Sequence, residues 1–148
     1  MNEELVLCSG LNITKIRRIE EFVISGNSFN DDCNDIAKMK LIFIQLPRLK
    51  RIEIEKKCFK YIREFVIDGL EQLESVKIGK YCFKVGDEGR ADGICRIINC
   101  SKLRQLEIGY ECFHDFQSLE ISNVNSLQSI KIGEECFKYI EEFSLKGE

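Results

Sequence analysis

The sequence feature that most constrains the fold is an internal repeat in which a small residue is followed by phenylalanine. It occurs as Ser28-Phe29, Cys58-Phe59, Cys82-Phe83, Cys112-Phe113 and Cys136-Phe137. The small residues are separated by 30, 24, 30 and 24 residues, so 24 residues form the basic unit and every second unit carries six more. A fixed period of this length is typical of folds that stack one supersecondary unit many times.

Each unit also contains two short apolar patterns. One precedes the small residue, as Leu106-Glu-Ile108 precedes Cys112, and the other lies half a unit away, as in Phe65-x-Ile67. Apolar residues at alternate positions are typical of a half-buried strand. We therefore predict a mainly β protein, a parallel β-solenoid of about five 24-residue coils with short strands on two faces. Successive coils would lie about 4.8 Å apart and would bury their apolar side chains by stacking.

The additional residues form two insertions, predicted near residues 30–40 and 84–94 and on the same rim of the solenoid. The chain, residues 1–148, is predicted to be one domain. Repeat proteins usually end in atypical polar repeats, and neither end of this sequence has one. Two alternatives follow from the uncapped ends: copies associate end to end, or the chain is a segment of a longer array.

The first copy of the repeat resembles a known family. Its pattern, Ile19-x-x-Phe22-x-Ile24-x-x-Asn27-x-Phe29, resembles the leucine-rich repeat consensus L-x-x-L-x-L-x-x-N-x-L, with Ile and Phe in place of Leu. Later copies contain Ile-Gly-x-x-Cys-Phe, which is similar to the Ile-Gly-x-x-Ala-Phe of the BspA-like branch of that family. The resemblance implies a leucine-rich-repeat fold that serves as a binding surface.

The later copies depart from the family at one position. Where the family has Asn, they have Lys57, Tyr81, Glu111 and Glu135. In the family that Asn bonds the backbone of the bend. We therefore expect the bends of this chain to be held in another way.

The composition narrows the classes of partner. The 148 residues are 44% hydrophobic and 32% charged, which is typical of a globular protein. The net charge is −3 and the basic residues form no long run, so neither nucleic acid nor a membrane surface is expected as a partner. No apolar run approaches the roughly 18 residues of a membrane span. Residues 1–4 lack the basic start of a signal peptide, so a cytoplasmic location is expected, or an extracellular one if the chain belongs to a secreted array.

Most of the eight cysteines occupy positions of the repeat where small or apolar residues also occur. Cys58, Cys82, Cys112 and Cys136 share the position of Ser28, and Cys8, Cys95 and Cys100 occupy apolar positions of the second pattern or near it. We predict that these seven are buried free thiols, which suits a reducing compartment; a disulfide framework is the alternative. Cys33 lies among Asp and Asn residues of the first insertion, and its thiol is predicted to be accessible.

No residues form a recognisable catalytic or metal-binding motif. The sequence has no Cys-x-x-Cys pair and a single histidine, His114, so no metal and no cofactor are expected. Cys112 is two residues from His114, but its repeat position points into the core. A nucleophile needs an adjacent base, so we predict that the protein is not an enzyme.

The exposed residues of the first strand pattern are the candidate site. Between its two apolar residues lie Val23, Glu53, Lys77, Glu107 and Lys131, and the charges of the last four alternate. We predict a non-enzymatic protein-binding module that recognises a protein or peptide through this strand face and the rim loops. The predicted binding residues are Arg51, Glu53, Lys77, Gln105, Glu107 and Lys131.

Other interpretations of the exposed residues remain open. The alternating charges could only set strand register and solubility, because exposed pairs contribute little. The chain could also be a structural or surface-adhesion segment of a longer array. On the second strand pattern, Ile42 and Val66 are predicted to be exposed neighbours and so a minor contact patch.

Overall fold

The computed structural model describes residues 18–30, 40–84 and 92–146, which form two parallel β-sheets and contain no helix. The first sheet, here called the odd sheet, has the order β1-β3-β5-β7-β9. Its strands are β1 (Glu21–Ile24), β3 (Arg51–Ile54), β5 (Ser75–Ile78), β7 (Gln105–Ile108) and β9 (Ser129–Ile132). The second, the even sheet, has the order β10-β8-β6-β4-β2. Its strands are β2 (Lys40–Phe43), β4 (Glu64–Asp68), β6 (Gly93–Ile98), β8 (Phe116–Ser122) and β10 (Glu142–Lys146).

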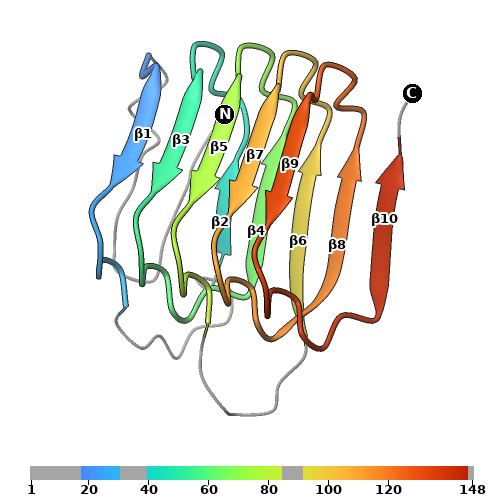
Figure 1. The fold of residues 1–148 in the computed structure, drawn as a ribbon. Coiled ribbons are helices and arrows are strands. Elements are labelled where there is room, and N and C mark those ends of the chain that lie inside the picture. Colours follow the sequence, from blue (N-terminus) through green and yellow to red (C-terminus); the bar gives the residue numbers. More distant parts are fainter. Residues whose placement is uncertain (1–17, 31–39, 85–91, 147–148) are drawn as a thin grey trace.

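The described chain passes from one sheet to the other at every strand, so that the two sheets face each other (Figure 1). Every strand pairs in parallel with the strand one repeat before or after it. The prediction of a mainly β protein with short strands in two sets is therefore confirmed. Its physical basis is the alternation of apolar and polar residues, which gives each strand one face for the interior.

The core lies between the sheets and is built from equivalent residues of successive repeats. The odd strands contribute pairs such as Ile52 with Ile54 and Val76 with Ile78, and all four side chains are buried. The even strands contribute matching pairs such as Phe65 with Ile67. One continuous apolar cluster contains these residues, so no repeat has a separate core.

The five repeated phenylalanines form one column inside the protein, as predicted. The successive ring centroids, from Phe29 to Phe59, Phe83, Phe113 and Phe137, are 5.1, 5.6, 4.5 and 5.2 Å apart. The planes of neighbouring rings differ by at most 12°. Such near-parallel stacking follows from a strict period, because each ring takes the same conformation directly beside the previous one.

Backbone hydrogen bonds between repeats hold the bends after the odd strands. The residue at the family's Asn position has a φ between 58° and 65° in all five copies. In four of them its N–H donates to a carbonyl of the next repeat, at distances of 2.8 to 2.9 Å. These bonds are Asn27 to Lys56, Lys57 to Lys80, Tyr81 to Tyr110 and Glu111 to Glu134. The main chain can thus replace the Asn side chain that the later copies lack.

The apolar side chains of the last strands are exposed, because no further repeat packs on them in the described structure. Ile130 and Ile132 of β9 are 39% and 40% exposed, whereas their counterparts in β7, Leu106 and Ile108, are buried. Leu145 of β10 is likewise exposed. A repeat therefore needs a neighbour on both sides to bury its apolar side chains.

One expectation about residues of the even sheet was wrong. Val66 is buried, with 7% exposure, because it lies between the longer side chains of Ile42 and Arg96 in the sheet register. The expected exposed pair with Ile42 is therefore not formed. Gly93 and Ile94, at the end of the second predicted insertion, belong to β6. Most of both predicted insertions lies outside the described residues.

Candidate functional site

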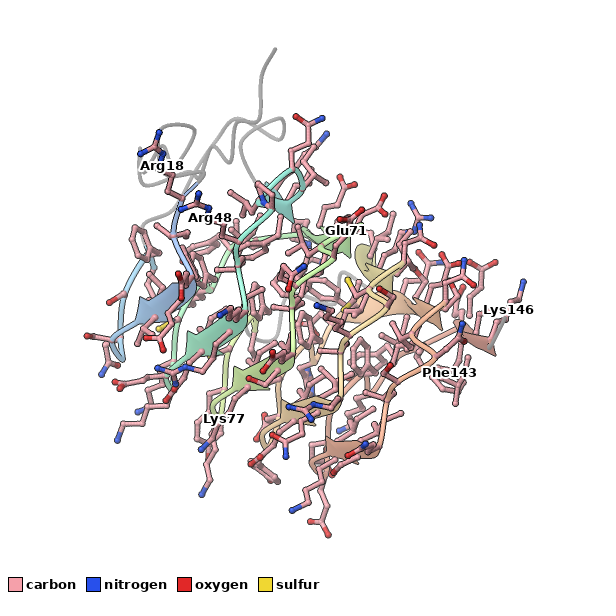
Figure 2. The ribbon with its side chains drawn as sticks, turned by 90° about the horizontal axis from the view of Figure 1, so that it is seen from above. Arg18, Arg48, Glu71, Lys77, Phe143 and Lys146 are labelled. Carbon is pink, nitrogen blue, oxygen red and sulfur yellow. The ribbon has the colours of Figure 1, made fainter. Side chains whose placement is uncertain are left out.

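The structure brings all six predicted binding residues onto the outer face of the odd sheet. In the strand register Glu53 lies beside Lys77, Lys77 beside Glu107 and Glu107 beside Lys131. Arg51 and Gln105 occupy the position two residues earlier, with Ser75 between them. We call the six residues Arg51, Glu53, Lys77, Gln105, Glu107 and Lys131 the charged strip. Figure 2 shows Lys77 projecting from the odd sheet away from the other sheet.

Among the described residues, the ion pairs of the charged strip lie at its Arg51 end. Arg51 Nη2 lies 3.1 Å from Glu21 Oε1, and its Nη1 contacts Glu53 Oε1. The hydrogen bond with Glu21 raises the pKa of Arg51 above its ordinary value.

The other charges of the strip are not paired with one another. Within the described residues Lys77, Glu107 and Lys131 form no ion pair, although their strands are adjacent, and all three are exposed. Holding two long exposed side chains together costs conformational entropy that the attraction in water barely offsets. These charges therefore remain available to a partner.

Sequence reasoning missed a hollow of about 640 Å³ beside the strip. Its lining comes from β3, β5 and the bends that follow them, and contains Glu53, Ile54, Glu55, Lys56, Lys57, Lys77, Gly79, Lys80 and Tyr81. The signal was present in the sequence, because Lys56-Lys57 and Lys80-Tyr81 are 24 residues apart. It was missed because the apolar period says nothing about where side chains of the bends point.

Cys58, Cys82, Cys112 and Cys136 occupy equivalent positions of successive repeats, here called the cysteine column, and their thiols are bonded to the backbone. Each Sγ donates to a carbonyl of the preceding repeat, at 3.2, 3.0, 2.7 and 2.9 Å. The pairs are Cys58 with Ser25, Cys82 with Glu55, Cys112 with Gly79 and Cys136 with Gly109. The six described cysteines are free, and five are buried. The predicted burial is confirmed for five of these six thiols, whereas Cys136 is only half-buried. Cys8 and Cys33 lie outside the described residues.

Thiol labelling is expected to follow this burial. The neighbouring Cys112 thiol raises the pKa of Cys82 to about 12, with burial adding to the shift, and burial raises the pKa of Cys95. Little thiolate forms at mildly alkaline pH, and only the thiolate reacts.

In native-state alkylation with peptide mass mapping, half-buried Cys136 should react before Cys58, Cys82 and Cys112. These three thiols should react only after denaturant is added. Equal rates for Cys82 and Cys136 would contradict the buried column. Cys33, predicted to be accessible, should react fastest of all.

The single histidine contacts Asp115 and Tyr139 in the described structure. His114 Nδ1 lies 3.0 Å from Asp115 Oδ1, and the ring meets Tyr139 edge-on at 5.5 Å. The Cys112 thiol instead donates to the Gly79 carbonyl at 2.7 Å. Cys112 and His114 therefore each have a partner of their own and do not form a nucleophile–base pair.

Candidate metal-binding groups and helices that could span a membrane are both absent from the described residues. No group of three or more His, Cys, Asp or Glu side chains within residues 18–30, 40–84 and 92–146 is arranged to hold a metal ion. The same ranges contain no helix that could cross a membrane.

Comparison of the chain with models of known protein families, with curated proteins and with solved structures gives no significant match. The function of the chain is therefore inferred from the geometry of the two sheets and the chemistry of their exposed faces.

Proposed function

We propose that this chain is a non-enzymatic protein-binding module, built as a leucine-rich-repeat-type parallel β-solenoid of about five 24-residue coils. The repeat of 24 residues and the alternation of the chain between two parallel sheets support this architecture. Its partner is a protein or peptide, which it recognises through the charged strip and the rim loops. No cofactor takes part.

The observation that carries the proposal is the charged strip itself. Lys77, Glu107 and Lys131 stand in register on three neighbouring strands, exposed and without ion pairs in the described chain. Parallel strands fix their spacing at about 4.8 Å, so a partner meets an ordered pattern of both signs. Complementary charges on a rigid face give specificity and fast association.

The buried free thiols support a cytoplasmic location as part of the same proposal. Disulfides are rare in reducing compartments, and the described cysteines are not bridged although four of them are stacked in one column. Membership of a secreted array would instead place the chain outside the cell.

A structural role is the second candidate, and the exposed end of the sheets favours it. Ile132, Phe143 and Leu145 are 40%, 59% and 55% exposed at the outer edges of β9 and β10 (Phe143 is marked in Figure 2). Large exposed apolar side chains beside open strand edges invite a further strand. On this alternative the occupant is another repeat of a longer array, or a second copy joined end to end.

A pull-down from the native host with a charge exchange tests the binding function. The double variant Lys77→Glu with Glu107→Lys keeps the net charge but reverses the middle of the strip. We expect recovery of the partner to fall at least about tenfold, since each lost contact of about 1.4 kcal/mol is a factor of ten.

The matched control exchanges a charge pair on the outer face of the even sheet. Arg96 Nε lies 2.9 Å from Glu120 Oε1, so Arg96→Glu with Glu120→Arg preserves a pair there. This control should leave recovery unchanged. Full recovery with the strip variant would rule out the strip as the binding surface.

A further inference from the structure

The hollow beside the charged strip has an unusual local charge for a protein of net charge −3. Four lysines line it, Lys56, Lys57, Lys77 and Lys80, and none of them forms an ion pair within the described residues. Lys77 lies in β5, and the other three lysines lie in the bends that follow β3 and β5.

The two carboxylates that line the hollow already have partners. Glu53 Oε1 contacts Arg51, and Glu55 Oε1 accepts a hydrogen bond of 2.9 Å from the Gly26 N–H. In the described structure only Glu53 is paired with a cation, because the Gly26 N–H is neutral and leaves the charge of Glu55 in place. The lining therefore has four ammonium groups against two carboxylates, which is a net charge of +2.

The backbone fixes the positions of two of the lining side chains. Lys57 and Tyr81 have φ values of 59° and 63°, in the left-handed region that such residues rarely adopt. Their N–H groups donate to Lys80 O at 2.8 Å and to Tyr110 O at 2.9 Å. The same left-handed φ recurs at this position in all five repeats, so it belongs to the bend and fixes where the Lys57 and Tyr81 side chains leave the backbone.

The hollow also offers an aromatic surface. Lys57 Nζ lies 6.0 Å from the centre of the Tyr81 ring, and the Tyr81 ring meets Tyr110 edge-on at 5.7 Å. Gly79 allows the two bends to approach, because a Cβ there would lie 2.8 Å from Lys56 N. An anionic group entering the hollow would meet ammonium groups beside a tyrosine.

From these observations we infer that the hollow binds an acidic segment of a peptide, rich in Asp or Glu. The inference rests on the proposed function and names the chemistry of its partner. A nucleic acid fits less well, because its uniform negative charge would also meet Glu107 along the strip. A peptide can place carboxylates in the hollow and a basic residue opposite Glu107.

The test is the affinity of the full chain for a fluorescent peptide of alternating Glu and Ser, measured by anisotropy at low salt. Wild type should bind this probe and should bind the matching Gln–Ser peptide at least about tenfold more weakly. The triple variant Lys56→Gln, Lys57→Gln, Lys80→Gln should lose binding of the acidic probe by a similar factor. Circular dichroism of the triple variant checks that it remains folded.

A second triple variant controls for overall charge. Lys102→Gln, Lys138→Gln and Lys146→Gln removes three lysines that do not line the hollow, and it should keep the affinity within about twofold. Equal loss in the two triple variants would overturn the inference, as would equal binding of the Gln–Ser peptide. Stronger competition by a single-stranded oligonucleotide than by the unlabelled acidic peptide would also overturn it.

This experiment can fail separately from the proposed function. If the acidic probe does not bind while the Lys77–Glu107 exchange still abolishes recovery of the partner, the strip is the binding surface and the hollow is not. If recovery is indifferent to that exchange, the proposed function itself is wrong, whatever the probe does.

Discussion

Replacement of Phe83 by alanine is expected to destabilise the folded protein by about 3–5 kcal/mol, as large-to-small changes in a core do. Phe83 is fully buried, and its ring stacks on Phe59 at 5.6 Å and on Phe113 at 4.5 Å. The Phe65 ring of β4 packs against it at 4.9 Å, so Phe83 also contacts the even sheet. Alanine would leave a cavity that neighbours on both sides of the column cannot fill. Urea unfolding followed by circular dichroism measures the change.

Phe143→Ala is the matched control, because it makes the same substitution at a side chain that is 59% exposed. Phe143→Ala should lower the free energy of unfolding by less than about 1 kcal/mol. If Phe83→Ala does not fold, Phe83→Leu should give a smaller loss in the same direction. A loss below about 1 kcal/mol for Phe83→Ala would mean that the column contributes little to stability.

Gly109→Ala is expected to lower the free energy of unfolding by about 1–3 kcal/mol, which is typical when extra atoms are forced into a packed region. An added Cβ would lie 2.9 Å from Lys80 N and 3.0 Å from Gly79 C. Both atoms belong to the backbone of the preceding repeat, so no side chain can rotate away. The repeats would have to separate at a point where Gly109 N–H donates to Ile78 O at 2.8 Å.

Gly26→Ala provides the comparison for Gly109→Ala. The nearest atom to its added Cβ would be Lys56 O at 3.3 Å, which a small shift relieves. Urea unfolding of the two variants should therefore give the larger loss of stability for Gly109→Ala. Equal losses, or none, would show that the spacing between repeats adjusts freely.

The repeat period predicted the parts of the structure that stacking determines. Phe83 and Cys82 recur at a fixed interval, and residues at equal places in parallel, stacked repeats must lie side by side. The same period predicts that Lys77 lies beside Glu107, as it does in the sheet register. Register in a parallel sheet follows from the period, so these predictions needed no knowledge of the bends.

What the sequence did not predict depends on local backbone conformation. The bends are held through main-chain bonds such as Lys57 N to Lys80 O, which no side-chain pattern encodes. The lysine-lined hollow is a consequence of those bends, and the burial of Val66 depends on the size of its neighbours across the sheet. The resemblance to leucine-rich repeats remains a prediction.

The central claim, that the charged strip is a protein-binding surface, is tested most directly by a nuclear magnetic resonance titration. The isotope-labelled chain is titrated with the protein recovered in the pull-down, and changes in backbone amide signals are assigned to residues. The account predicts that the largest changes fall on Lys77, Glu107 and Lys131, with none on Arg96 or Glu120. Changes confined to Ile132 and Leu145 would instead support the array, and changes centred on Arg96 and Glu120 would contradict the account.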